Sequence, residues 1–128
     1  MAEPHPFRRA AESKDLALLT ETLREDVVLH SPILFRGFRG RDTVAAVLTH
    51  VATTLEDLTY VDELGDGKSV CLRFKAKVAG TDRDLEGIDF LELDDDGRVA
   101  ELTVFMRPLS ALTAFNEQMS ARLGGSEG

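Results

Sequence analysis

The sequence predicts an α+β domain in which helices cover one face of a curved β-sheet. Three segments in the second half of the chain alternate apolar and polar side chains in phase, which is the pattern of strands with one buried face. Segments with helical spacing lie before and after these strands, and this segregation is typical of the α+β class. The 128 residues are expected to form a single domain over 1–128, with an ordered part over about 5–123.

The N-terminal third predicts two helices and a short strand. A first helix is expected over 4–11, and Ser13 offers a cap for a second helix over 15–23, whose leucines form an apolar stripe. The acidic pair at 25–26 is expected to end this helix. A strand over 27–29 then stops at Pro32, because proline cannot continue a ladder of hydrogen bonds.

A loop and a long helix are expected next. The segment 33–40 mixes aromatic residues, arginines and two glycines, which is typical of an irregular loop with tight turns. Arg36 and Arg39 in this loop, with Arg41 after it, either pair with the protein's own carboxylates or meet a ligand at a cavity mouth. From Arg41 or Asp42 to Leu55, apolar residues repeat at intervals of three and four, which predicts a helix packed on a sheet.

Four strands and a last helix complete the expected fold. The strands cover 56–64, 70–78, 85–93 and 99–107, the acidic segment 94–97 forms a turn, and a helix over 109–123 precedes a frayed tail at 124–128. Leu109, Leu112, Phe115, Met119 and Leu123 form the apolar stripe of that helix. The predicted inner faces of the last three strands carry Val70, Leu72, Phe74, Ala76 and Val78; Leu85, Gly87, Asp89, Leu91 and Leu93; and Ala100, Leu102, Val104 and Met106, with Val99 on the outer face.

Asp89 is unusual because it places a carboxylate on the apolar side of a predicted strand. Such a group must be paired, protonated or placed in a polar-lined cavity, since burial of a bare charge is costly. Its surroundings predict a pKa above the ordinary value of about 3.9 and a role as hydrogen-bond donor, general acid or general base. A structural carboxylate bonded to Ser31, to a backbone amide or to water is the alternative. The pattern predicts a pocket with Asp89 in its wall.

Composition excludes several classes of partner. A formal net charge of −8 disfavours nucleic acid and anionic membrane surfaces, because both bind Lys- and Arg-rich proteins. Cys71 is the single cysteine, so an intrachain disulfide is excluded and a reducing compartment is favoured. No apolar run approaches the roughly 20 residues of a membrane span, and the N-terminus lacks a signal-peptide core. We therefore expect a cytoplasmic protein.

The order helix, helix, short strand, helix and four strands is accompanied by local motifs. These are the Asp15-Leu16 helix start, DVVLHSP at 26–32, Gly40 before 44–47, Gly87-Ile88-Asp89-Phe90 and Gly97-Arg98-Val99. In these features the chain resembles the nuclear transport factor 2-like superfamily, and within it the branch of SnoaL-like polyketide cyclases and ketosteroid isomerases. The resemblance implies a cone-shaped, cystatin-like mixed sheet wrapped around a long helix, with an open-ended apolar cavity. The C-terminal helix would be an addition.

Compared residue by residue, the resemblance preserves little of the related active sites. The isomerase base falls on Ser31 and its oxyanion-hole tyrosine on Phe7, so only the buried acid has a counterpart, Asp89. Serine without a base does not move a proton between carbons at neutral pH, and phenylalanine donates no hydrogen bond. Limonene-epoxide hydrolases of the same superfamily use two carboxylates bridged by an arginine, and this triad is also missing. Leu102, Thr103 and Val104 stand where that family has its second acid, and Arg73 has no acid two residues further on. Asp89 does match the pocket acid that the cyclases use.

Asp89 and Ser31 are therefore the candidate catalytic residues, with Ser31 positioning substrate or water. A turn-stabilising hydroxyl is the alternative for Ser31, because no histidine adjoins it on its own face. His5, His30 and His50 lack metal-ligand spacing, so no metal and no other cofactor is expected. The predicted ligand-binding side chains are Phe7, Leu29, Leu72, Phe74, Leu91, Leu102, Val104 and Met106.

Three functions are compatible with this pattern. The first is a protein that encloses a small hydrophobic molecule, and it is favoured because one carboxylate without a partner makes a sparse active site. The second is a cofactor-independent cyclase, isomerase or hydrolase with Asp89 as acid or base. The third is a dimerisation domain with a filled interior. The resemblance also implies a homodimer through the exposed sheet face, where Phe90 and Phe105 would lie.

Overall fold

The computed structural model describes residues 4–122 and has the expected α+β architecture. The predicted tail at 124–128, Leu123 of the predicted last stripe and the predicted domain limits at 1 and 128 lie outside the described residues. The elements in chain order are α1 (Pro6–Ser13), α2 (Leu16–Thr22), β1 (Leu23–His30), β2 (Phe38–Arg39), α3 (Arg41–Thr54), β3 (Leu55–Gly65), β4 (Ser69–Val78), β5 (Asp84–Leu93), β6 (Val99–Arg107) and α4 (Leu109–Arg122).

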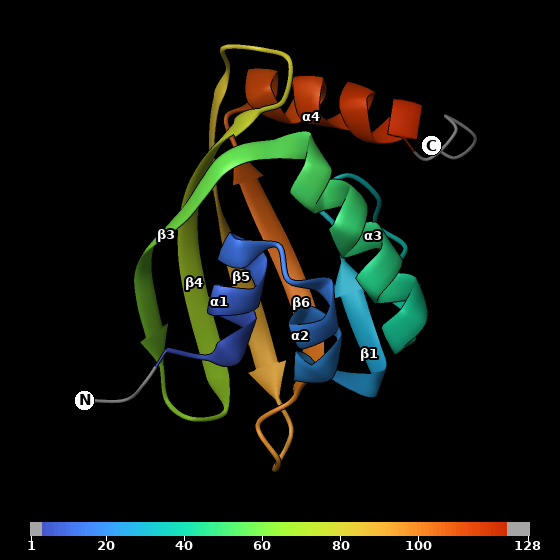
Figure 1. The fold of residues 1–128 in the computed structure, drawn as a ribbon, viewed down its shortest axis with the longest axis vertical. Coiled ribbons are helices and arrows are strands. Elements are labelled where there is room, and N and C mark those ends of the chain that lie inside the picture. The colour runs from blue at the N-terminus through green and yellow to red at the C-terminus, as the bar shows by residue number, and fades with distance from the viewer. Residues whose placement is uncertain (1–3, 123–128) are drawn as a thin grey trace.

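The strands form one curved, six-stranded sheet in the order β2-β1-β6-β5-β4-β3. The β1–β6 pair is parallel and the other neighbouring strands are antiparallel. Helices α1, α2 and α3 lie over one face of the sheet, and α4 crosses one end of it (Figure 1). The helices and the inner face of the sheet therefore enclose the interior between them.

The predicted inner faces of β4 and β5 are confirmed. Every second residue of β4 from Val70 to Val78 is buried, as are the four inner residues of β5 from Leu85 to Leu91. The assignment of β6 was wrong at its first residue, because Val99 is fully buried and not on the outer face. A register shift between Glu92 and Leu93 places Leu93 opposite Val99 and changes the alternation there.

The boundary between α2 and β1 also differs from the prediction. The helix ends at Thr22, and the chain enters the strand directly at Leu23. Leu23 and Val27 are both fully buried, whereas the acidic pair between them is exposed. A register shift between Leu23 and Val28 accommodates these polar residues within the strand. In the predicted loop, Phe38–Arg39 forms the short edge strand β2.

Helix α3 confirms the long helix predicted from its apolar spacing, and Val44 and Val47 are buried. Helix α4 buries Phe115 and Met119, but Leu109 is 77% exposed, so its assignment to the apolar stripe was wrong. Leu109 opens the helix, where the chain has just left β6, and does not face the interior. None of the helices in the described part of the chain is long and apolar enough to cross a membrane.

Candidate functional site

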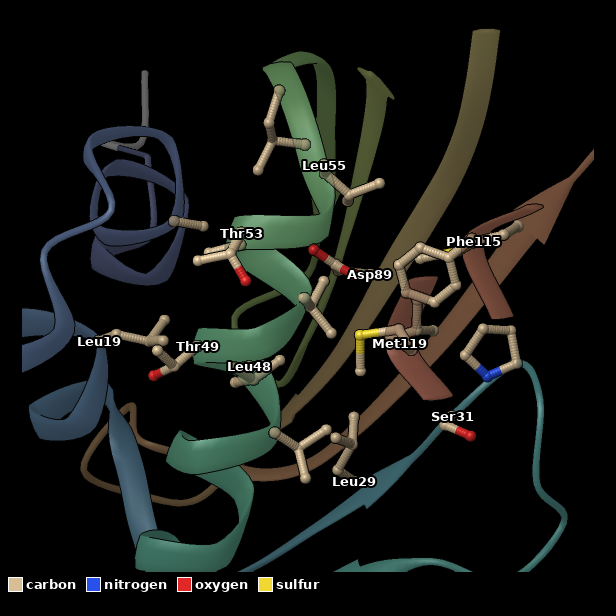
Figure 2. A pocket seen from close by; sticks show the side chains of 18 of the residues that line it. Leu19, Leu29, Ser31, Leu48, Thr49, Thr53, Leu55, Asp89, Phe115 and Met119 are labelled. Carbon is tan, nitrogen blue, oxygen red and sulfur yellow. The ribbon is translucent and has the colours of Figure 1, made fainter. Parts of the chain in front are cut away.

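A cavity of about 460 Å³ lies between the sheet and the helices. Its walls are mainly apolar side chains from α1, α2, α3, α4 and the inner face of the sheet. Asp89 points into this space, with α3 on one side and Phe115 and Met119 of α4 on the other (Figure 2). The polar side chains that line it are Lys14, Asp15, Ser31, Arg36, Thr49, Thr53, Tyr60, Asp89, Asn116 and Ser120, of which only Tyr60 and Asp89 are buried.

Asp89 and Tyr60 form a buried polar pair in the cavity wall. The inward phase of β5 places Asp89 on the inner face, where it is 7% exposed. Tyr60 comes from the edge strand β3, and its hydroxyl donates a hydrogen bond to Asp89 Oδ2 at 2.6 Å. The carboxylate is therefore paired, as a charged or polar group in an apolar interior must be.

Packing around Phe74 holds the Tyr60 ring in place. The two rings meet edge to face, with centroids 5.9 Å apart and planes at 73°. Phe74 in turn lies over Gly87, where an added Cβ would come within 2.6 Å of the ring and within 2.3 Å of the Phe105 carbonyl oxygen. Glycine is required at this position because it lets the ring and the neighbouring backbone approach closely.

Burial raises the pKa of Asp89 to about 6, because the apolar surroundings disfavour the charged carboxylate. The hydrogen bond from Tyr60 stabilises the charge and lowers the pKa in part. The pKa of the Tyr60 hydroxyl is raised well above its ordinary value, first by burial and then by the negative charge of Asp89. At neutral pH Asp89 is therefore mostly ionised, while Tyr60 keeps its proton.

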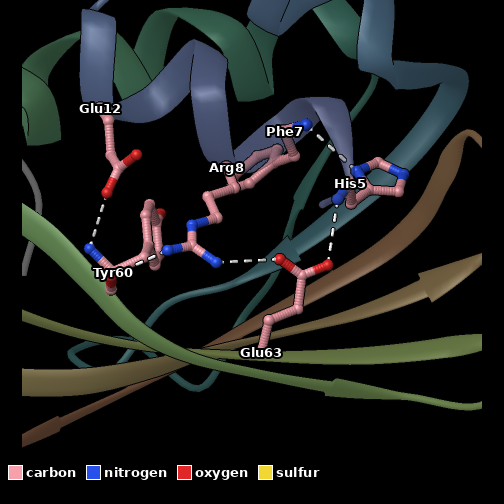
Figure 3. A network of polar contacts seen from close by, with 6 residues as sticks. All are labelled: His5, Phe7, Arg8, Glu12, Tyr60 and Glu63. Atoms are coloured by element: carbon pink, nitrogen blue, oxygen red, sulfur yellow. Dashed lines mark hydrogen bonds and ion pairs between the residues drawn. The ribbon is translucent and has the colours of Figure 1, made fainter. Parts of the chain in front are cut away.

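Charged side chains of α1 hold the backbone of Tyr60 from outside the cavity (Figure 3). Glu12 Oε2 accepts from the Tyr60 N–H at 2.9 Å, and Arg8 Nη2 donates to the Tyr60 carbonyl at 3.1 Å. Arg8 Nη1 also forms an ion pair with Oε1 of Glu63, a residue of β3 like Tyr60, at 3.3 Å. Glu63 Oε2 accepts a hydrogen bond from the backbone N–H of His5. Side chains of α1 thus satisfy the backbone N–H and carbonyl of Tyr60, the residue of the edge strand β3 whose hydroxyl lines the cavity.

Five of the eight predicted ligand-binding residues line the cavity: Phe7, Leu29, Phe74, Val104 and Met106. The other three, Leu72, Leu91 and Leu102, are fully buried on the predicted inner face but do not line the cavity. They pack into the hydrophobic core because an inward direction does not decide whether a side chain meets open space or another side chain.

Ser31 lines the same cavity as Asp89, at the end of β1. Its Oγ accepts from the backbone N–H of Ile33 at 3.2 Å and of Leu34 at 3.0 Å. These bonds close the turn after the strand, as serine side chains commonly do. The geometry fits the turn-stabilising alternative that the sequence left open.

Tyr60 is a residue of this site that the sequence pattern did not predict. Tyr60 is the single tyrosine of the chain. A buried tyrosine hydroxyl usually has a hydrogen-bond partner, so this residue was a candidate partner for the buried acid. The sequence does not show which residues of β3 face the interior, because register shifts interrupt the alternation on both sides of Tyr60. One lies between Glu56 and Thr59, and the other between Tyr60 and Asp62. The hydrogen-bond partner of the Asp89 side chain is therefore Tyr60 and not Ser31, which was one of the predicted partners.

The remaining charged candidates divide between the mouth of the cavity and the surface. Arg36 lines the cavity at an exposed position. Between residues 4 and 122, no ion pair joins Arg36, Arg39 or Arg41 to a carboxylate, so the first of the two alternatives, salt bridges to the protein's own acids, was wrong. In the same part of the chain, no three His, Cys, Asp or Glu side chains gather into a possible metal site.

Comparison with known proteins assigns the fold to a family. The sequence profile of the SnoaL-like domain matches residues 6–102. The chain belongs to the SnoaL-like domain family. No protein of curated function matches the SnoaL-like chain.

Solved structures similar to this SnoaL-like protein have the same architecture. A steroid delta-isomerase from Pseudomonas aeruginosa is 37% identical, with 93% of this chain and 87% of that chain covered and a TM-score of 0.86. An uncharacterised protein with a cystatin-like fold from Silicibacter pomeroyi is 31% identical, with coverage of 94% and 84% and a TM-score of 0.88. A nuclear transport factor 2-like protein of unknown function from Cytophaga hutchinsonii is 16% identical, with coverage of 84% and 88% and a TM-score of 0.65, and shows the fold alone.

Proposed function

We propose that this SnoaL-like protein binds a small hydrophobic molecule in its cavity, with the polar end of that molecule at Asp89. The observation that carries the proposal is an apolar wall interrupted by one buried carboxylate, which is backed by the Tyr60 hydroxyl. The volume of about 460 Å³ lies within the range of about 300–1,000 Å³ for small-molecule sites. Apolar contacts would supply most of the binding free energy, and the polar pair would orient the molecule.

Binding is tested with the neutral fluorescent probe N-phenyl-1-naphthylamine, whose emission rises in apolar surroundings. The wild type should bind it saturably, and Ala52→Phe, which adds a ring to the cavity wall on α3, should weaken binding by about tenfold or more. Ala46→Phe is the matched control, because Ala46 is exposed on the same helix and does not line the cavity. Absence of saturable binding, or equal binding by both variants, would contradict the proposal.

Proton transfer in the same cavity is the second candidate function. A carboxylate with a pKa of about 6 can take up and return a proton near neutral pH. The 37% identity to a steroid delta-isomerase supports this candidate. Asp89 would remove a proton from a carbon beside a carbonyl and return it to another carbon, with no net gain or loss. We place this candidate second because the Tyr60 hydroxyl donates its hydrogen bond to Asp89 and is not available to a developing oxyanion.

A β,γ-unsaturated 3-ketosteroid separates the two candidates, because its isomerisation yields a conjugated enone with strong ultraviolet absorbance. If proton transfer operates, the wild type turns this substrate over and Asp89→Asn loses about 100-fold or more in rate. Asp15→Asn is the control, since Asp15 is an exposed acid of the same lining and asparagine also caps helices. Probe binding without turnover of this steroid supports the binding function alone.

We also propose that two copies associate through the outer face of the sheet. Phe105 is 56% exposed and Ile88 is 37% exposed on neighbouring strands of this face. Charges of both signs surround them, since Arg73 pairs with Asp62 at 2.9 Å and Arg107 pairs with Glu86 at 2.9 Å. Two copies of such a face can oppose unlike charges while they bury the apolar side chains.

A further inference from the structure

The hydrogen bonds at the Tyr60–Asp89 pair determine what a ligand must offer. A tyrosine hydroxyl has a single proton, and in this structure it is directed to Asp89 Oδ2 at 2.6 Å. Among residues 4–122, no protein donor is bound to the other carboxylate oxygen, Oδ1, and Asp89 lines the cavity. The pair therefore presents an acceptor to the cavity and has no free donor.

We propose that the cavity selects hydrophobic ligands whose polar end carries a hydrogen-bond donor, a hydroxyl or an N–H, which binds Asp89 Oδ1. A ligand whose only polar atom is an acceptor, such as an ether or a ketone oxygen, is disfavoured. This inference rests on the proposed binding function, because it names the ligand class of the same site.

The position of Tyr60 keeps its proton directed to Asp89. Its ring is held edge-on against Phe74, and its backbone is held at both peptide groups by Arg8 and Glu12 of α1. Rotating the hydroxyl toward a ligand would break a short, charge-assisted hydrogen bond inside an apolar wall. The carboxylate would then lose the donor bond that stabilises its charge.

An acceptor-only ligand at Oδ1 would bring two acceptors together without a proton between them. Neither oxygen would regain the hydrogen bonds that it made with water, and an unpaired buried polar group is costly. Sites built to bond a ligand donor reject analogues that lack it for this reason. We expect at least about a tenfold difference in affinity, which corresponds to the lower end of such penalties.

Protonation of Asp89 should remove the preference. A protonated carboxyl is itself a donor, so an acceptor-only ligand can then bind it. Titratable groups facing the pair are few: Arg8 and Glu12 of α1 lie beside the Tyr60 backbone, and Lys14, Asp15 and Arg36 line the cavity at exposed positions. Burial raises the pKa of Asp89 to about 6, so the change should occur in mildly acidic solution.

Two probes with the same ring system test the inference: 2-naphthol, which carries a donor, and 2-methoxynaphthalene, which carries only an acceptor. Their affinities for the wild type are measured by calorimetry at pH 7.5 and at pH 4.5. The naphthol should bind about tenfold more tightly or better at pH 7.5, and the ratio should fall toward one at pH 4.5. The pH comparison uses the wild type alone, so it does not depend on the folding of a variant.

Variants add a second measurement. Asp89→Leu should reduce the affinity ratio at pH 7.5 toward one. Thr49→Val is the matched control and should leave the ratio unchanged, because the Thr49 hydroxyl lines the cavity but donates to the Ala45 carbonyl of its own helix. Equal affinities at pH 7.5, or tighter binding of the ether, would overturn the donor preference and leave the proposed binding function standing. If 2-naphthol, 2-methoxynaphthalene and N-phenyl-1-naphthylamine all fail to bind, both the donor preference and the proposed binding function are contradicted.

Discussion

At the scale of single residues, Asp89 and Tyr60 depend on one another. Without the hydroxyl of Tyr60, the carboxylate would lie in an apolar wall with no donor at Oδ2. Without the carboxylate, the hydroxyl of Tyr60 would lack the acceptor that satisfies it, and buried polar groups are costly to leave unpaired. The pair is therefore the most sensitive point of the interior.

The titration of Asp89 is the first prediction at this scale. Carboxyl NMR should show Asp89 titrating near pH 6, because burial disfavours the charged form. Tyr60→Phe should raise this pKa further, since it removes the hydrogen bond that stabilises the carboxylate. Asp66 provides an internal comparison, because hydrogen bonds from the backbone N–H groups of Lys68 and Ser69 lower its pKa. A wild-type value near four for Asp89 would contradict the buried pair.

The same pKa predicts how stability depends on pH. The folded protein binds the Asp89 proton more tightly than the unfolded chain, whose ordinary pKa is 3.8. The stabilisation from this group is thus fully present below pH 3.8 and is lost as the pH rises through about 6. The loss amounts to about 3 kcal/mol in the free energy of unfolding.

Denaturant unfolding of the wild type and Asp89→Asn at pH 3.5 and pH 7 measures this loss. The wild type should lose about 3 kcal/mol relative to the variant over that interval, because asparagine does not titrate. Surface acids with a lowered pKa, such as the exposed Asp84 and the half-buried Glu86, act in the opposite direction but are common to both proteins. A difference in stability that is independent of pH would show that Asp89 keeps an ordinary pKa.

At the scale of elements, helix α1 supports the exposed edge of the sheet. β3 is the last strand in the sheet order, so its outer backbone groups have no neighbouring strand. Arg8 and Glu12 lie four residues apart on one side of α1 and satisfy both peptide groups of Tyr60. This contact links the N-terminal helix to the wall of the cavity and protects an edge that could otherwise pair with another chain.

Glu12→Ala should weaken this contact, because it leaves the Tyr60 N–H without its acceptor. We expect faster hydrogen exchange of the Tyr60 amide and a loss of about 1 kcal/mol in the free energy of unfolding. Glu12→Gln is the matched control, since the amide oxygen can accept the same bond, and it should retain most of the protection. Equal exchange rates in the wild type and Glu12→Ala would show that α1 does not hold this edge.

At the scale of the whole molecule, the two faces of the sheet have different roles. The inner face forms the core and the cavity, while the outer face exposes Phe105 and Ile88 among charged pairs. A partner on the outer face would leave the cavity unobstructed. The proposed homodimer and the proposed ligand site are thus compatible within one molecule.

Sedimentation velocity tests the homodimer. At micromolar concentration the wild type should sediment as a species with twice the mass of one chain. The Phe105→Glu variant should sediment as a monomer, because the substitution places a charge in the apolar part of the interface. Leu109→Glu is the matched control, since Leu109 is also exposed but lies at the start of α4 and not on the sheet. A monomeric wild type would contradict the proposal.

Much of this architecture was predictable from local pattern. The inner faces of β4 and β5, the inward position of Asp89 and the long helix α3 all follow from side-chain periodicity, which depends on neighbours within a few residues. Predictions failed where the periodicity is interrupted. Val99 and Leu23 lie next to register shifts, and such bulges are set by the pairing of strands distant in the sequence.

The sequence by itself determined the fold class, the family and the presence of an acid on an apolar face. Only the tertiary structure decided that Tyr60 is the partner of that acid, and that Leu72, Leu91 and Leu102 fill the core while Phe7 and Met106 line open space. The physical reason is that periodicity specifies the direction of a side chain. What the side chain then meets depends on the curvature of the sheet and the placement of the helices, which arise from contacts between distant segments.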